Sequence, residues 1–145
     1  MAETFEFEIV TPARSIYAEQ VELVIIPGAG GNFGVLPGHA PLLSTIQPGV
    51  IEIREKSLGI VDLYFVDGGF AEVTPERTAV LAEEAIRVAH ISRDDAEARL
   101  RRAHDALMAS KSLGLRSLAE HDVKTAEAMV AACDAYAGGG GRGHG

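Results

Sequence analysis

Two adjoining segments hold the residue types most often found at ligand sites. The glycine-rich run PGAGGNFG (27–34) leads directly into GVLPGHAP (34–41). Such a loop can cradle a phosphate when it passes from a strand into a helix whose N-terminus faces the anion. Here Pro37, Gly38 and Pro41 follow the glycines, and no Lys-Ser or Lys-Thr pair does. Because this sequence cannot continue as a helix, it favours a turn between strands over a nucleotide site.

The histidines and the cysteine do not indicate a metal site or a catalytic nucleophile either. The five histidines never stand three or four residues apart, the spacing that puts two metal ligands on one helical face. We interpret His39 as a contact or hydrogen-bonding residue and not as a ligand. The single cysteine, Cys133, falls on an apolar helical stripe, as buried thiols do. No serine, cysteine or carboxylate pair stands in catalytic company, so we expect no catalytic residue, no metal and no hydrolase activity.

Composition and charge bound the class of protein. With 145 residues, 47% of them hydrophobic, we predict one domain carrying at most a small appendage. No apolar run approaches the roughly 20 residues of a membrane span, and MAETFEFEIV does not resemble a secretory signal, so we expect a soluble cytoplasmic protein. The net charge is −8, yet residues 1–86 hold 4 Lys and Arg against 13 Asp and Glu, whereas residues 87–145 hold 9 against 8. The acidic first part disfavours nucleic acid and anionic lipid as partners.

The acidic part has the pattern of a β-sandwich. Phe5, Phe7 and Ile9 alternate with glutamates, which is typical of a strand with one wet face. Turn signals separate this run from five others, so residues 1–86 are predicted to form a flattened antiparallel β-sandwich domain. The six runs are FEFEIV (5–10), VELVII (21–26), VIEIR (50–54), IVDLYFV (60–66), FAEV (70–73) and TAVLA (78–82). We expect positive-φ turns at four glycines, Gly28, Gly30, Gly31 and Gly34, and the tightest point of a rigid loop at Gly38.

Residues 87–137 are predicted to form an α-helical hairpin. Ser92 precedes two aspartates as an N-cap does, and a second capping box runs from Ser117 to Glu120, after a break at 112–114. Apolar residues follow at 4-3-4 spacing: Ala96, Leu100, Ala103 and Leu107 in the first helix, and Ala119, Val123, Ala126, Val130, Cys133 and Ala137 in the second. Because alanine buries little apolar area, we expect the hairpin to hold the sandwich weakly. The run GGGGRGHG (138–145) predicts a flexible tail without regular structure.

Four segments, in this order and spacing and followed by a helical hairpin, resemble the epsilon subunit of bacterial F-type ATP synthases, the counterpart of the mitochondrial delta subunit. They are FGVLPGHAPLL (33–43), QPGV (47–50), FVDGGFAEV (65–73) and TAVLAEEA (78–85). The resemblance implies a sandwich of about ten strands and a non-catalytic rotor subunit of the central stalk. Such a subunit joins the gamma subunit to the c-subunit ring, couples proton flow to ATP synthesis, and sits on the cytoplasmic face of the bacterial plasma membrane as a peripheral component.

The resemblance also implies two sets of contact residues. The loop surface facing gamma and the c ring comprises Asn32, Phe33, Gly38 and His39. The hairpin surface meets the alpha and beta subunits transiently and restrains ATP hydrolysis, through basic residues that face an acidic stretch: Arg99, Arg101, Arg102 and Lys111. Because the alanine stripes offer few large anchors, we expect this restraint to be weak.

Two departures from the family pattern limit what is carried over. Some epsilon subunits bind ATP through I-D-x-x-R-A, whereas this chain has ISRDDA (91–96), with Ser92 for the acid and Asp95 for the arginine. An aspartate in place of a phosphate-facing cation argues against ATP as a cofactor, although a regulatory ATP-binding module remains the alternative function. Asn32 stands where some relatives place an acid near the c ring, so a polar contact survives there but an ion pair does not.

Overall fold

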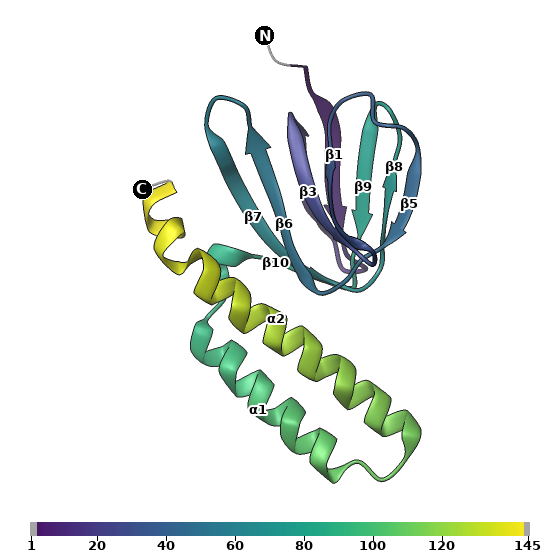
Figure 1. Cartoon of the computed structure of the whole chain (residues 1–145), viewed down its shortest axis with the longest axis vertical. Helices are drawn as coiled ribbons and strands as arrows, with labels where there is room; N and C mark the ends of the chain where they lie inside the picture. The colour runs from purple at the N-terminus through teal and green to yellow at the C-terminus, as the bar shows by residue number, and fades with distance from the viewer. Residues whose placement is uncertain (1–2, 144–145) are drawn as a thin grey trace.

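The computed structural model describes the backbone of residues 3–143 and the side chains of residues 3–136, and it shows a β-sandwich followed by a helical hairpin (Figure 1). One sheet has the strand order β2 (Ser15–Val21), β1 (Phe5–Val10), β9 (Arg77–Leu81), β8 (Phe70–Val73), β5 (Leu42–Thr45). The other has the order β10 (Glu84–Arg87), β7 (Gly59–Asp67), β6 (Gly49–Glu55), β3 (Leu23–Gly28), β4 (Gly31–Val35). The predicted ten-stranded sandwich is confirmed, and β1 with β9 is the one parallel pair among antiparallel ones in the described residues.

The period-2 pattern of β1 explains how the core forms. Phe5, Phe7 and Ile9 are buried, while Glu6 and Glu8 between them stay on the wet face. Ile26 of β3 and Ile51 of β6 close the same core from the other sheet. The four strands that sequence runs did not single out, β2, β4, β5 and β10, all lie at sheet edges, where one flank is unpaired and the apolar pattern is weaker.

The glycines of the first turn act differently from the prediction. Of the four expected positive-φ positions only Gly31 has one, at +121°, and Gly28 and Gly34 lie inside strands. Gly28 is required for space, because a Cβ there would lie 2.8 Å from Cε1 of Phe33. Gly38 does have the predicted left-handed conformation, with φ at +82°.

The hairpin begins after a short 3₁₀ turn, η1 (Val88–His90), and consists of α1 (Arg93–Ala109) and α2 (Leu113–Gly143). Ser92 is the N-cap of α1 as predicted, and its hydroxyl accepts a hydrogen bond from the Asp95 N–H at 3.2 Å. The predicted second capping box is wrong, because α2 starts at Leu113 and Ser117 lies inside it. Ser112 performs the capping, five residues earlier than expected, since its Oγ accepts from the Leu115 N–H at 3.2 Å.

The predicted boundary at Gly138 is also wrong, because α2 continues to Gly143. Residues 144–145 of the predicted tail lie outside the described residues, as does the side chain of Ala137.

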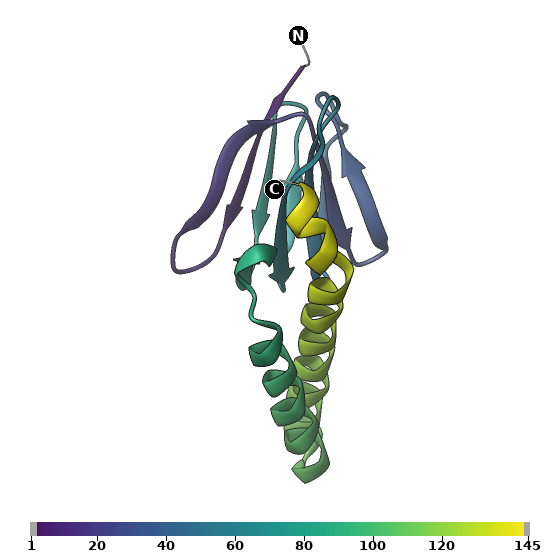
Figure 2. The ribbon, with the colours of Figure 1, turned by 90° about the vertical axis from the view of Figure 1, so that its left-hand side faces the viewer.

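The two helices run antiparallel and extend beyond one end of the sandwich, and the later turns of α2 lie against β6 and β7 (Figures 1 and 2). The sandwich ends at Arg87 and α1 starts at Arg93, so η1 and its flanking residues form the only covalent connection between the two parts. The hairpin is therefore folded onto the sheet that contains β7.

Candidate partner-contact surfaces

The loop between β4 and β5 is fixed by backbone hydrogen bonds. The Gly38 N–H donates to the Pro75 carbonyl at 2.9 Å, and the His39 N–H donates to the Leu36 carbonyl at 3.2 Å. The imidazole Nδ1 of His39 lies 2.7 Å from the Ala40 carbonyl, to which it donates in the Nδ1–H tautomer. His39 is half-buried and lies outside the hydrophobic core, so its side chain is held in one orientation at the surface.

The structure does not gather the four predicted loop residues into one patch. Asn32 is exposed and pairs with Pro27 next to the β3–β4 turn, close to the end of β5 where the Ala29 N–H bonds to the Thr45 carbonyl. Gly38 lies at the other end of β5, beyond the pairing of Leu42 with Val73. The ring of Phe33 packs against the core. Gly38 and His39 thus lie together, and Asn32 lies at the opposite end of these strands.

An exposed apolar row that the sequence analysis missed crosses the outer face of the sheet containing β5, β8 and β9. Leu43 is 68% exposed, Phe70 41% and Leu81 40%. Phe70 is paired directly with Leu81 on one side and with Thr45 on the other, and Leu43 is two residues from Thr45 on the same face. An apolar row of this kind is a surface that another protein can cover. The Leu42-Leu43 pair after Pro41 was its only sequence signal.

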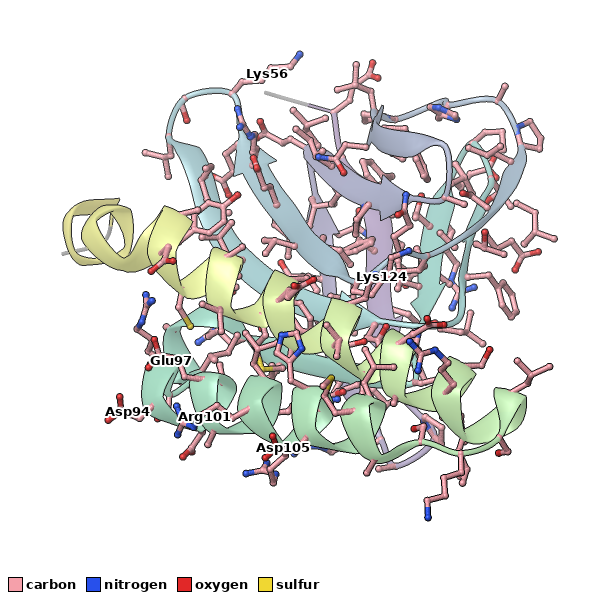
Figure 3. All side chains as sticks on the ribbon, turned by 60° about the horizontal axis from the view of Figure 1, so that its bottom comes forward. Lys56, Asp94, Glu97, Arg101, Asp105 and Lys124 are labelled. Atoms are coloured by element: carbon pink, nitrogen blue, oxygen red, sulfur yellow. The ribbon has the colours of Figure 1, made fainter. Side chains whose placement is uncertain are left out.

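The basic residues predicted on the hairpin fall into two groups. Arg101, Arg102 and Lys111 are exposed, and Arg101 projects from α1 on the side away from α2 (Figure 3). Arg99 is only partly exposed, because it turns inward to Glu84 on β10, with Nη1 to Oε2 at 2.8 Å and Nη2 to Oε1 at 3.2 Å. This hydrogen bonding raises the pKa of Arg99, so its charge is fixed. In the folded hairpin the first group is exposed, whereas Arg99 is engaged with Glu84.

The hairpin packs against the sandwich through an apolar cluster, called the apolar dock below. This cluster centres on Phe65, which is fully buried and points out of the sandwich toward the hairpin. Met129 and Ala132 of α2 and Ala96 of α1 are buried around it. The predicted alanine stripe did not include Met129, because this residue lies on a second row of α2 that faces the sandwich. The long side chain of Met129 buries apolar area that alanine lacks.

The polar contacts between the hairpin and the sandwich all have the same direction: carboxylates on the sandwich accept hydrogen bonds from donors on the hairpin. Besides Arg99 and Glu84, the Tyr136 hydroxyl donates to Oε2 of Glu52 at 3.0 Å. Burial, followed by the hydrogen bond to Glu52, raises the pKa of Tyr136. The third carboxylate is Asp67 at the end of β7, whose Oδ2 accepts from Oγ1 of Thr125 at 3.0 Å. In all three contacts the carboxylate belongs to the acidic residues 1–86, and one of the three donors, Arg99, is charged.

The segment that aligns with the ATP-binding motif has structural duties here. Ser92 is the cap of α1, and Ile91 packs against the Phe65 cluster. The Arg93 guanidinium is shared between Glu97, at 3.1 Å, and Asp134 of α2. The segment therefore presents a capped helix and a neutralised arginine.

Within residues 3–143, no three His, Cys, Asp or Glu side chains are grouped so that they could hold a metal ion. The described helices include none that is long and apolar enough to cross a membrane. A sandwich with an exposed apolar row, a fixed surface loop and a hairpin with exposed arginines offers surfaces that other proteins can cover.

Comparison with known proteins identifies the family. The family described as "ATP synthase, Delta/Epsilon chain, beta-sandwich domain" matches residues 4–88. The ATP synthase epsilon chain of Rhodospirillum rubrum is 46% identical over 132 residues, covering 91% of this chain and 98% of the relative. That of Granulibacter bethesdensis is 42% identical over 134 residues, with the same two coverages. The chain therefore belongs to the ATP synthase epsilon chain family, and it is a non-catalytic subunit of that membrane-associated complex.

Solved structures with the same fold extend the comparison. A chain in the structure of the Euglena gracilis mitochondrial ATP synthase, OSCP/F1/c-ring, has a TM-score of 0.76 at 24% identity, covering 89% of this chain and 81% of that one. A chain in the Tetrahymena thermophila central stalk/c-ring structure has a TM-score of 0.63 at 12% identity, covering 90% and 97%. At these identities the likeness establishes a shared fold that includes the hairpin.

Proposed function

We propose that the chain is a rotor subunit that links the gamma subunit to the c-subunit ring at the cytoplasmic face of the bacterial plasma membrane and couples proton flow to ATP synthesis. The observation that carries this proposal is the near-complete coverage of epsilon-chain relatives, 98% of their length at 46% identity. The apolar row with Leu43 and Phe70 supplies a surface for a large partner, and the fixed loop at His39 supplies a stiff contact. Stiffness matters in a part that transmits torque.

Co-purification tests the proposal most directly. A tagged copy expressed in its own bacterium should bring down the gamma subunit and the c ring, and Leu43→Glu should reduce the recovery of gamma by placing a charge in the apolar row. Lys56→Glu is the control, because Lys56 is exposed on the β6–β7 turn, outside this row. Normal recovery of the complex with Leu43→Glu would show that the row is not the docking surface.

His39 tests the loop separately. Replacing His39 with glutamate should loosen coupling, measured as ATP-driven proton pumping per ATP hydrolysed in membrane vesicles. The isolated chain should keep its thermal unfolding temperature, because His39 is outside the core. Unfolding of the isolated variant would instead make His39 a structural residue and overturn its role as a contact.

The hairpin contributes a weak restraint on ATP hydrolysis, in contact with the alpha and beta subunits. Arg101, Arg102 and Lys111 are exposed while the hairpin is folded, whereas Arg99 becomes available to an acidic partner only after it leaves Glu84. When the hairpin leaves the sandwich, the ion pair between Arg99 and Glu84 breaks, and its loss opposes extension of the hairpin. Deleting residues 88–145 should raise membrane ATP hydrolysis only slightly, and a many-fold rise would contradict weak restraint.

The alternative function, regulation through bound ATP, is disfavoured by the segment 91–96. The Ser92 hydroxyl accepts a hydrogen bond from the Asp95 N–H, and the Arg93 guanidinium forms ion pairs with Glu97 and Asp134. Position 95, where the motif has arginine, holds an aspartate. Titration of the isolated chain with ATP, followed by NMR shifts, should show no saturable change. Binding at millimolar concentration or tighter would favour the alternative.

A further inference from the structure

Gln47 is an exposed residue whose side chain bonds to the turn between β3 and β4. Its Nε2 donates to the Gly28 carbonyl at 2.7 Å and to the Ala29 carbonyl at 2.9 Å. The Gln47 N–H also donates to the Pro27 carbonyl at 2.9 Å. One residue after the end of β5 is therefore bonded to three successive residues of the glycine-rich run, and both amide hydrogens of its side chain are used.

The backbone on either side of Gln47 braces the same end of the sandwich. Gly28 and Ile46 form an antiparallel bridge, and the Ala29 N–H donates to the Thr45 carbonyl at 3.0 Å. The Ile46 N–H donates to the Gly69 carbonyl, also at 3.0 Å, in the turn between β7 and β8. The β3–β4 turn, which belongs to one sheet, is thus tied to the end of β5, which belongs to the other.

These bonds bring the β3–β4 turn beside the apolar row. Ala29 lies opposite Thr45 in the antiparallel bridge, so the two side chains lie on the same face. Thr45 is paired with Phe70, and Phe70 is paired with Leu81 on its other side. All four residues are exposed, so the turn continues the surface that the row offers to another protein.

The turn has little side-chain packing of its own to fix its shape. No atom lies within 4 Å of a Cβ built at Gly30 or at Gly31, and glycine has the greatest backbone freedom of any residue. A turn of this kind keeps one conformation when outside groups hold its backbone, which the Gln47 amide does. A contact that is ordered before binding loses less entropy when the partner arrives.

We propose that Gln47 is a positioning residue for partner binding, which holds the β3–β4 turn, with Asn32 at its end, in one conformation beside the apolar row. Turn and row then form a single stiff contact for the gamma subunit. The inference rests on the proposed function, which assigns the row to gamma. Gln47 acts through the turn and not by touching the partner.

Amide exchange in the isolated full chain measures whether Gln47 holds the turn. Gln47→Met keeps the length of the side chain and removes both donors. The N–H of Ala29 should then exchange roughly threefold to tenfold faster, because two hydrogen bonds that brace the turn are lost. Gln20→Met is the matched control, since Gln20 is the other glutamine of the chain and is exposed on β2. An unchanged Ala29 exchange rate in Gln47→Met would overturn the proposal.

Retention of gamma shows whether the held turn matters for binding. A tagged full chain is captured with its complex, and the gamma subunit that remains after a fixed series of washes is measured. Gln47→Met should lower the retained gamma by roughly twofold to fivefold, and Gln20→Met should match the wild type. If the wild type retains no gamma, the proposed function is overturned and this inference falls with it. If the wild type and Gln47→Met retain gamma equally, only the positioning role is overturned.

A disulfide separates positioning from direct contact. Ala29→Cys and Thr45→Cys are added to Gln47→Met in a Cys133→Ala background, because opposite residues of an antiparallel pair are close enough to be bridged. Oxidation should restore gamma retention to the level of the same cysteine pair with Gln47 present, and reduction should lower it again. The chain that keeps Gln47 should respond to neither treatment. Retention that stays low once the disulfide has formed would show that Gln47 does not act through the turn.

Discussion

Arg99 on α1 donates two parallel hydrogen bonds to Glu84 on β10, at 2.8 and 3.2 Å, across the connection formed by η1. A bidentate pair of this kind fixes both the distance and the orientation of its two elements. The residues between them, 88–92, are where a folded hairpin must bend to leave the sandwich. The pair therefore holds the hairpin at its hinge, while Met129 and Tyr136 hold it farther along α2.

Removing the hinge pair should loosen docking by a modest amount. Arg99→Ala is expected to cost about 1 kcal/mol of docking free energy, because both side chains are partly exposed and the ion pair is screened. The double variant Arg99→Glu with Glu84→Arg should recover part of this loss. Arg102→Ala, which changes an exposed arginine on the same helix, is the control. Pulsed EPR distances between nitroxides at Ser57→Cys on the β6–β7 turn and Glu127→Cys on α2, in a Cys133→Ala background, report the result. Equal effects of Arg99→Ala and Arg102→Ala would contradict the role of the pair.

The apolar dock predicts what happens when the hairpin is removed. A chain of residues 1–87 should fold but self-associate, because Phe65 and its partly buried neighbours Val50, Leu63 and Ile86 lose their cover. Phe65→Thr should restore a monomer in the truncated chain and, in the full chain, weaken docking by about 2 kcal/mol. Sedimentation velocity measures both association states.

Phe70→Thr provides the comparison for this prediction. Phe70 is 41% exposed in the intact chain and lies in the other sheet, so its replacement should affect the full and truncated chains alike. A truncated chain that stays monomeric at high concentration would show that the face around Phe65 tolerates water.

Much of the fold was predictable because its signals are local, whereas the docking contacts depend on long-range geometry. The alternation of Phe5, Phe7 and Ile9 indicates a strand by itself, and Ser92 before two aspartates indicates a helix start. The contact between Asp67 and Thr125 joins residues 58 positions apart and leaves no pattern in either segment. Met129 was missed for a related reason, since a helix with two buried faces has no single stripe.

The contact residues of the loop show the same limit. Sequence order placed Asn32 close to His39, but a strand rises about 3.3 Å per residue, and Asn32 lies near the start of β4 while His39 follows its end, so the two residues lie at opposite ends. The family resemblance supplied the function that composition alone could not, because a surface for another protein has no fixed motif. Exposed leucines such as Leu43 become recognisable as a surface only once the register of β5 is known.

Among the described glycines, Gly69 is the one at which a side chain would meet the closest contact. Its φ is +87°, and a Cβ there would lie 1.7 Å from the Leu81 carbonyl oxygen, which is backbone and cannot turn aside. Gly69→Ala should therefore lower the free energy of unfolding by more than about 3 kcal/mol. Gly30→Ala should change it by less than about 1 kcal/mol, because no atom lies within 4 Å of a Cβ there. Urea unfolding followed by circular dichroism checks both, and a small effect at Gly69 would mean that the β7–β8 turn can rearrange.

The final prediction concerns alkaline pH and the tyrosine cluster between the sheets. Tyr17 of β2 lies 5.9 Å from Phe7 and 5.5 Å from Tyr64, ring centre to ring centre. Burial, followed by the negative charge of Asp62, raises the pKa of Tyr17 to about 12. The unfolded chain loses this proton near pH 10, so the folded state binds it more tightly, and the resulting stability is complete below about pH 10 and is lost as pH rises toward 12.

Replacing Tyr17 with phenylalanine isolates this contribution, because the ring contacts remain and only the ionisable hydroxyl is removed. Because Tyr17 is partly exposed, solvent screening reduces its share, and we expect the wild type to lose about 1 kcal/mol more than Tyr17→Phe between about pH 9 and about pH 12. Some slope remains in the variant, since burial also raises the pKa of Tyr64 and Tyr136. Urea unfolding at a series of pH values gives the two slopes, with tyrosinate absorbance reporting ionisation. Identical slopes would mean that the Tyr17 hydroxyl ionises equally readily in the folded and unfolded chains.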